Sequence, residues 1–341
     1  METTNRASII AEAGVNHNGS LDLARKLVLA AKEAGADAVK FQTFKAERVA
    51  QRNAPKADYQ LRNTDGAESQ IEMLRKLELP DSAHEELIAL CREIGIEFLS
   101  TPYNEEDVDF LHGLGVRAFK LASIHCVEPH FLRYAARTGR HLIVSTGMAT
   151  LNEVAQAVAA IRGVGHEDFT LLQCTTNYPS AVADANVRAI QLLRAEFQCA
   201  VGYSDHTQSD VSSIAAVALG ATMIEKHFTL DKTMPGPDHT SAAEPAEFAA
   251  LVQKIRSTEA ALGSGLKEPC AAEMANATNM RRSLVARRDI ARGEAIAEAM
   301  LTCQRPASGI SPLRVNELTG RTAAVSIPAG TRLTWEMTND E

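Results

Sequence analysis

The chain has 341 residues, of which 45% are apolar, and its formal net charge is −8. This length and apolar content allow a large core with a short additional module, which argues against a mainly disordered protein. The acidic charge and the lack of any basic run argue against nucleic acid as a partner, and no stretch of about 18 uncharged apolar residues could span a membrane.

Eight short apolar runs end in polar or charged residues, and most begin just after a glycine that follows an amphipathic stretch. Glycine in this position commonly ends a helix, and continuous apolar runs are typical of parallel strands buried on both faces. Eight such units over roughly 260 residues predict an α/β fold, a closed (β/α)8 TIM barrel. The runs are residues 8–12, 35–40, 95–100, 115–120, 139–145, 169–174, 200–204 and 220–227.

The connection after the second run is unusually long, extending from residue 44 to about residue 69 before a helical pattern resumes at 71–77. Loops of this length in a compact domain are usually lids, binding loops or partner contacts. A further helix is expected near 82–93, with Pro80 at its start.

After the last run, the chain changes character twice. We expect the barrel to occupy residues 1–265, a linker to follow over 266–280, and a small C-terminal module to occupy 281–341. Short strand-like runs separated by glycine and proline indicate that this module is rich in β-structure and turns.

Two histidines, His206 and His227, follow neighbouring strands at the end where barrel enzymes carry their chemistry. Two imidazoles there are typical of an open divalent-metal site completed by water and substrate, because a closed structural zinc site takes four ligands. The alternative is that each histidine is a hydrogen-bonded structural residue. His239 is a possible third ligand, although a role in stabilising its loop is favoured.

Two lysines, Lys40 and Lys120, end the second and fourth strands. Buried lysines need an anion, so they indicate a phosphate or carboxylate ligand, or else pairing with an acid such as Glu12. Glu12 itself could act as a general acid or base, or could only neutralise a lysine. Small hydroxyl donors that could complete an anion site are Thr101, Ser123, Ser145 and Ser204.

Eight segments of the expected barrel carry recognisable motifs: residues 11–19 (AEAGVNHNG), 39–44 (VKFQTF), 98–102 (FLSTP), 145–148 (STGM), 174–179 (CTTNYP), 202–207 (GYSDHT), 225–229 (EKHFT) and 236–239 (GPDH). Taken together, these segments resemble the sialic acid synthase family, which makes N-acetylneuraminate, legionaminate and related nine-carbon acids. The resemblance extends over almost the whole chain, and residues 281–286 and 304–306 resemble that family's antifreeze-like (SAF) domain.

The resemblance implies a transferase that joins phosphoenolpyruvate to the open-chain aldehyde of an N-acyl-mannosamine-type aminosugar, with carbon–oxygen cleavage and release of phosphate. It implies that His206 and His227 hold Mn2+ or Mg2+, which polarises the aldehyde, and that Glu12 handles protons. The phosphoenolpyruvate site would comprise Lys40, Gln42, Thr101, Lys120, Ser123, Ser145 and Ser204.

For the sugar, the resemblance implies contacts with Tyr178 and Asp238, and with Arg305 supplied by the partner subunit of a domain-swapped homodimer. In the family's usual Ser-Gly-Glu stretch a glutamate contacts the sugar, and here His125 stands in its place. Residues 174–179 and 56–60 lean toward the legionaminate branch, so the expected product is N,N'-diacetyllegionaminate or N-acetylneuraminate.

Two other classes of function remain open from the sequence. A metal-dependent barrel hydrolase would use the same histidines to activate water, but more ligands would be expected. A non-catalytic carbohydrate- or ice-binding protein would be led by the C-terminal module, which lacks a regular threonine array.

The compartment is inferred from the cysteines and from the N-terminus. Six cysteines show no CxxC spacing and mostly occur in apolar contexts, and the first residues show no apolar signal-peptide region. We therefore expect a cytoplasmic protein with reduced thiols.

Overall fold

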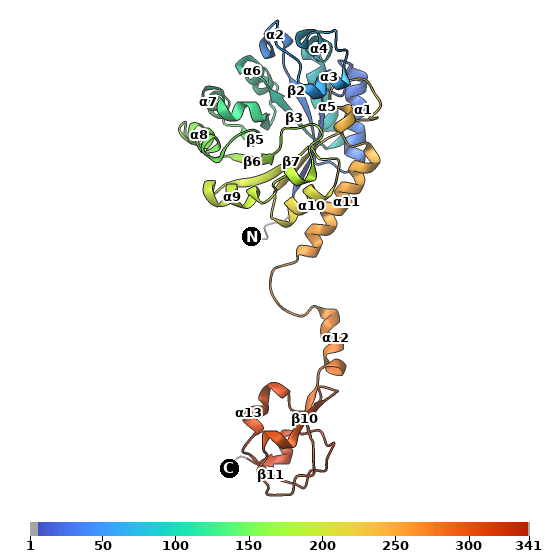
Figure 1. Ribbon diagram of the computed structural model, residues 1–341, viewed down its shortest axis with the longest axis vertical. Helices are drawn as coiled ribbons and strands as arrows, with labels where there is room; N and C mark the ends of the chain where they lie inside the picture. Colours follow the sequence, from blue (N-terminus) through green and yellow to red (C-terminus); the bar gives the residue numbers. More distant parts are fainter. Residues whose placement is uncertain (1–5, 340–341) are drawn as a thin grey trace. The chain divides into compact units, whose positions relative to one another are not determined.

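A computed structural model describes residues 6–339, and it confirms the predicted fold class. Eight parallel strands form a closed barrel in the order β1 to β8, with β1 paired to β8, and helices surround it (Figure 1). The strands are β1 (Ser8–Gly14), β2 (Ala38–Thr43), β3 (Glu97–Pro102), β4 (Ala118–Leu121), β5 (His141–Ser145), β6 (Phe169–Cys174), β7 (Ala200–Asp205) and β8 (Met223–His227).

The helices of the barrel unit begin and end at the signals that the sequence carries. Ser20 caps the first helix by accepting a hydrogen bond from the Leu23 amide at 3.3 Å. Gly95 ends α5 with a φ of 70°, a left-handed conformation that glycine adopts without steric cost. The helices are α1 (Leu21–Glu33), α2 (Ala46–Val49), α3 (Asp58–Asn63), α4 (Gln70–Lys76), α5 (Asp81–Ile94), α6 (Glu105–Gly113), α7 (Pro129–Arg137), α8 (Leu151–Arg162), α9 (Ala189–Phe197), α10 (Val211–Ala218) and α11 (Pro245–Leu262).

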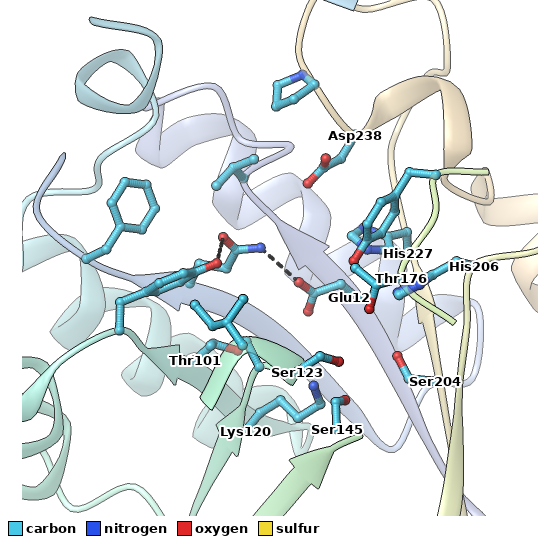
Figure 2. A pocket seen from close by; sticks show the side chains of 18 of the residues that line it. Glu12, Thr101, Lys120, Ser123, Ser145, Thr176, Ser204, His206, His227 and Asp238 are labelled. Atoms are coloured by element: carbon cyan, nitrogen blue, oxygen red, sulfur yellow. Dashed lines mark hydrogen bonds between the residues drawn. The ribbon is translucent and has the colours of Figure 1, made fainter. Parts of the chain in front are cut away.

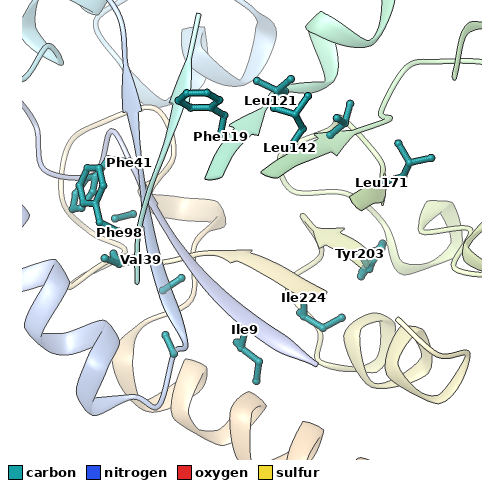
Figure 3. Close-up of a cluster of buried hydrophobic side chains, with 14 of the residues drawn as sticks. Ile9, Val39, Phe41, Phe98, Phe119, Leu121, Leu142, Leu171, Tyr203 and Ile224 are labelled. Atoms are coloured by element: carbon teal, nitrogen blue, oxygen red, sulfur yellow. The ribbon is translucent and has the colours of Figure 1, made fainter. Parts of the chain in front are cut away.

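Side chains alternate along each strand between the barrel interior and the surrounding helices. Outward side chains such as Phe41, Phe119 and Tyr203 are almost fully buried and form the main core with the helices (Figure 3). Inward side chains near the strand starts form a second apolar cluster, which includes Ile10, Leu99, Ala118, Ile143 and Leu172. This cluster fills the barrel interior below the polar residues at the C-terminal ends of the strands.

The barrel interior has no space for a side chain at Gly202 on β7. A Cβ there would lie 2.5 Å from the Met223 carbonyl oxygen and 2.6 Å from Leu172 Cδ2, both closer than real Cβ contacts. Glycine at this position therefore lets the neighbouring strands fill the interior.

The second compact unit begins at Ser264, whereas the first ends at Gly263. It has its own apolar core, which includes Leu284, Leu318 and Leu333. Its elements are α12 (Ala271–Met280), β9 (Ser283–Ala286), β10 (Leu301–Gln304), α13 (Val315–Leu318), β11 (Thr322–Ala323) and β12 (Thr338–Asn339).

Two segments of this unit differ from the sequence-based expectation. Part of the expected linker, 266–280, is helical, because Glu273 accepts a hydrogen bond from the Cys270 amide at 3.0 Å and caps the start of α12. One of the strand-like runs that we expect in this module, residues 331–334, forms only a single bridge, between Val285 and Arg332. Within residues 6–339, no helix is long and apolar enough to cross a membrane.

Candidate active site

The polar residues predicted at the strand ends converge above the apolar layer of the barrel interior. Because side chains two apart share a face, Glu12 follows Ile10 inward, Lys120 follows Ala118, and Ser145 follows Ile143. They line a cavity of about 330 Å3 at the C-terminal face (Figure 2). The predicted residues that line it are Glu12, Lys40, Gln42, Thr101, Lys120, Ser123, Ser145, Tyr178, Ser204, His206, His227 and Asp238.

Both lysines pair with carboxylates in this cavity. Lys40 Nζ lies 2.5 Å from Glu12 Oε2 and donates a 3.0 Å hydrogen bond to Thr101 Oγ1. Lys120 Nζ lies 3.3 Å from Glu225 Oε1, which also accepts a 2.8 Å hydrogen bond from Ser204. The pairing of Lys40 with Glu12, one alternative left by the sequence, is therefore present, and an anionic ligand would share these lysines.

The two carboxylates have opposite pKa shifts. Burial raises the pKa of Glu12 to about 7, although Lys40 opposes the shift. Burial would also raise the pKa of Glu225, but Lys120 and Lys40 outweigh it and lower that pKa to about 2. Near neutral pH, Glu12 can therefore exchange a proton while Glu225 remains charged.

The two histidines lie side by side, with ring centroids 5.4 Å apart. The Nδ1 of His206 lies 2.7 Å from the Thr175 carbonyl oxygen, which can only accept, so this nitrogen carries a hydrogen and Nε2 is left for a ligand. The buried Nδ1 of His227 has no hydrogen-bond partner. Burial, followed by the charges of His206 and Lys40, lowers the pKa of His227 well below its usual value, which favours the neutral, metal-binding form.

Nothing beyond the histidine pair forms a preassembled metal cluster in the described part of the chain, since no group of three His, Cys, Asp or Glu side chains there could hold an ion. His239 is not a ligand, because it is fully buried and its Nδ1 lies 2.6 Å from Thr229 Oγ1. Its favoured role in stabilising the loop agrees with this contact.

Hydroxyl groups surround the cavity near Lys120. The buried Ser145 Oγ has no hydrogen-bond partner, so it is free to bind a ligand. Ser123 Oγ accepts a 3.0 Å hydrogen bond from the Gly147 amide. A Cβ at Gly147 would clash with Thr176 Oγ1 and lie 2.7 Å from Ser123 Oγ, so the loop after β5 approaches these hydroxyls without a side chain.

Only some of the residues expected to bind the sugar line the cavity. Tyr178 and Asp238 line the cavity, and burial raises the pKa of Asp238 to about 6 against the influence of His206. His125 does not line it, because the short helical turn after β4 directs its ring onto Phe131, at a centroid distance of 4.2 Å. This corrects the expectation that His125 stands at the sugar site.

Arg305 belongs to the second unit, where its Nε donates a 3.1 Å hydrogen bond to the Met280 carbonyl oxygen.

Among the polar residues of the cavity that received no role from the sequence are Glu225 and Tyr103. Glu225 lies two residues before His227 on the same strand, and this spacing could have placed it on the inward face. Tyr103 follows β3 and donates a 3.0 Å hydrogen bond to Gln42 Oε1, while Gln42 Nε2 donates a 3.3 Å bond to Glu12 (Figure 2). No motif marks this contact, because it depends on the path of the loop.

Comparison with known proteins identifies the family. A model described as the NeuB family matches residues 27–267, and a model of the SAF domain matches residues 281–337. The chain belongs to the NeuB family.

Several proteins with named activities are similar to this chain over most of its length. The N,N'-diacetyllegionaminic acid synthase of Campylobacter jejuni is 47% identical, over 92% of this chain and 95% of that protein. The synthase of the same name from Legionella pneumophila is 46% identical, over 96% and 93%. A crystal structure of N-acetylneuraminic acid synthetase from Leptospira borgpetersenii is 34% identical with a TM-score of 0.71, and the match covers 80% of this chain and 90% of that one. These relatives favour neither the hydrolase nor the non-catalytic alternative.

Proposed function

We propose that this protein is a nonulosonic acid synthase, a transferase that condenses phosphoenolpyruvate with the aldehyde of an N-acyl-mannosamine-type aminosugar. The observation that carries the proposal is the convergence of Lys40, Lys120, His206 and His227 on one cavity in a chain of the NeuB family. The names of two relatives, at 46% and 47% identity, favour N,N'-diacetyllegionaminate as the product.

Phosphoenolpyruvate would bind to the lysines and hydroxyls of the cavity. Its carboxylate and phosphate require cations, and Lys40 and Lys120 line the same cavity as the unpartnered Ser145 Oγ. Further contacts are assigned to Gln42, Thr101, Ser123 and Ser204.

The histidine pair fits a divalent ion, Mn2+ or Mg2+. The Thr175 carbonyl fixes the tautomer of His206, and the depressed pKa of His227 keeps that imidazole neutral. When bound, the ion supplies Lewis-acid polarisation of the aldehyde carbonyl.

Glu12 would carry the protons of the reaction. As carbon three of phosphoenolpyruvate forms a bond to the aldehyde carbon, the aldehyde oxygen takes a proton from Glu12. Water then adds to carbon two and returns a proton to Glu12. The carbon–oxygen bond to phosphate then breaks as the new hydroxyl at carbon two becomes the keto group, and the proton of that hydroxyl leaves with the phosphate. A carboxyl whose pKa is raised to about 7 can both give and take a proton at neutral pH.

Tyr178 and Asp238 would contact the sugar, and Arg305 would reach it from the partner subunit of a domain-swapped homodimer. We assign residues 1–265 to catalysis, 266–280 to a linker and 281–341 to the SAF domain. The free cysteines fit a reducing compartment, the cytoplasm.

The decisive experiment measures phosphate release from phosphoenolpyruvate with Mn2+ and a panel of aminosugars. The panel includes N-acetylmannosamine and 2,4-diacetamido-2,4,6-trideoxymannose, and turnover is expected with at least one of them. His227→Ala should abolish turnover and weaken Mn2+ binding, followed by electron paramagnetic resonance, while circular dichroism stays unchanged. No phosphate release with any sugar from folded, metal-loaded protein would overturn the proposal.

A further inference from the structure

A buried ion pair lies behind the two histidines, on the outer side of strands β7 and β8. Asp205 and Lys226 are 1% and 5% exposed, and Lys226 Nζ lies 3.0 Å from Asp205 Oδ2. Two residues earlier on the same strands, the outward side chains are Tyr203 and Ile224, which belong to the apolar core. Burying two charges there costs free energy that apolar side chains would not, so stability alone does not account for the pair.

This ion pair takes no direct part in the catalytic cavity. The buried lysines of the cavity can be shared with a ligand, whereas neither Asp205 nor Lys226 lines it. The strands alternate, so Ser204 and Glu225, one residue earlier, face the cavity and bond to each other at 2.8 Å. The outer pair therefore acts on the site only through the chain.

Each member of the pair directly precedes one of the two histidines. Asp205 and Lys226 are opposite each other in the register of β7 and β8. His206 and His227 follow them and line the cavity, with ring centroids 5.4 Å apart (Figure 2). The ion pair thus joins the two strand ends at the last residues before the imidazoles.

The same network also holds the chain on the far side of His206. Thr207, the next residue, has both backbone groups bound, since its amide donates to Asp205 Oδ1 at 2.9 Å and its carbonyl oxygen accepts from Lys226 Nζ at 2.6 Å. Ser213 on α10 donates to Asp205 Oδ2 at 2.7 Å, which fixes the carboxylate. His206 is therefore held on both sides by one buried network.

A metal site built on two histidines depends on how the two strand ends are spaced. Each imidazole supplies one nitrogen, and both must be held within about 0.5 Å of the geometry that the ion requires. Because such a site depends on both ligands, a shift of one strand end relative to the other weakens it. Groups that support metal-binding histidines commonly change metal affinity by about 10- to 100-fold when they are mutated.

We propose that Asp205 and Lys226 are positioning residues that set the spacing of the two imidazoles and thereby the affinity of the site for a divalent ion. This inference rests on the proposed function, in which His206 and His227 hold Mn2+ or Mg2+. Without the pair, both histidines remain but the strand ends are no longer joined. Metal affinity should then fall while the barrel stays folded, and saturating metal should restore turnover.

The test measures Mn2+ binding to the metal-free full chain by electron paramagnetic resonance, separately from turnover. Asp205→Asn keeps the size of the side chain and removes its charge, so the Kd for Mn2+ should rise about 10-fold. Phosphate release at saturating Mn2+ should return to near the wild-type rate, with an unchanged KM for phosphoenolpyruvate. Ser213→Ala removes a single hydrogen bond to Asp205 and should raise the Kd about threefold, so it carries the test if Asp205→Asn does not fold.

Asp37→Asn is the matched control, because Asp37 is a carboxylate that joins two strands at the opposite end of the barrel. Its Oδ2 accepts hydrogen bonds from the Ile9 amide on β1 at 2.9 Å and from Arg256 at 2.8 Å, and it directly precedes β2. This variant should lower the stability of the barrel, measured by urea unfolding, and leave the Kd for Mn2+ unchanged.

The possible outcomes separate this inference from the proposed function. An unchanged Kd in folded Asp205→Asn, or in Ser213→Ala if the first variant does not fold, overturns the inference alone. So does an equal loss of affinity in Asp37→Asn, which would show that affinity follows the stability of the barrel, or a rate that stays low at saturating Mn2+. Failure of the wild type to bind Mn2+ overturns both the proposed metal site and this inference.

Discussion

At the scale of single residues, the cavity contains two carboxylates, those of Glu12 and Glu225, that differ widely in acidity. Glu225 contacts Lys120 and Ser204, and its pKa falls to about 2, so it acts as a fixed counter-charge. Glu12 contacts Lys40 but is more strongly affected by burial, and its pKa rises to about 7. Opposite shifts in one cluster support the proton-carrying role that we propose for Glu12.

Glu225 makes a testable contribution to stability. Its folded pKa lies below the ordinary value of 4.5, so the unfolded chain binds more protons between pH 4.5 and about 2. The stabilisation is therefore fully present above pH 4.5 and is lost as the pH falls through that window. Glu12 has the opposite sign, since its raised pKa makes stability fall as the pH rises from 4.5 to about 7.

We expect Glu225→Gln to lower the free energy of unfolding by about 3 kcal/mol at pH 7, because a buried lysine loses its partner. The difference from the wild type should shrink as the pH is lowered below 4.5. Urea unfolding of metal-free protein, followed by circular dichroism between pH 3 and pH 7, measures this. A difference that stays constant with pH would contradict the assignment of the shift to Glu225.

At the scale of elements, alternation along the strands explains why so much of the site was predictable. His227 and Lys120 line the cavity because a strand of period two leaves only one inward set once its apolar residues are assigned, and His206 directly follows β7. His125 was misplaced because it follows a strand in a short turn, where side-chain direction depends on local packing. The helical pattern expected over 71–77 is confirmed by α4, whereas α2 and α3 were not predictable, since helices of four and six residues are too short for a clear periodicity.

Helix α4 lines one side of the cavity with Gln70, Met73 and Leu74, and it offers a test of how that side is held. Ser69 and Glu72 form a reciprocal cap, in which the Ser69 amide donates to Glu72 at 2.9 Å and the Glu72 amide donates to Ser69 at 3.3 Å. Ser69→Ala should cost about 1 kcal/mol of local stability, raising amide exchange in α4 about fivefold. Because residues of α4 line the cavity, the KM for the sugar should rise as well.

Thr150→Ala is the matched control, because Thr150 and Glu153 form the same cap on α8. It should raise amide exchange in α8 and leave the sugar KM unchanged, since neither residue lines the catalytic cavity. Hydrogen exchange followed by mass spectrometry, with steady-state kinetics, separates the two variants. An equal effect of both on the sugar KM would show that α4 has no special connection to the substrate.

At the scale of the whole molecule, the chain comprises two compact units with separate apolar cores. Trp335, the one tryptophan of the sequence, lies in the second unit, with the guanidinium of Arg314 4.4 Å from its ring centroid. Its fluorescence therefore reports on this unit. Most helices belong to the first unit, so circular dichroism mainly reports on the barrel.

Arg305 tests the proposed exchange of domains between subunits. Arg305→Ala should raise the sugar KM with little change in the KM for phosphoenolpyruvate, because the assigned contact is to the acyl group. At a sugar concentration far below the wild-type KM, the Arg305→Ala and Glu12→Gln variants should then each have much lower activity than the wild type. Unchanged Trp335 fluorescence and circular dichroism are the controls that both variants fold.

Mixing the two variants tests whether Arg305 contributes to the active site of its own chain or to that of the partner subunit. If each C-terminal domain acts on the partner's barrel, a mixed dimer has one site with native Glu12 and native Arg305, and its other site lacks both. Random exchange of equal amounts, through mild dissociation and reassembly, should therefore restore about a quarter of the wild-type activity. If Arg305 serves the barrel of its own chain, every site in the mixture still lacks one residue, and activity should stay at the average of the two variants.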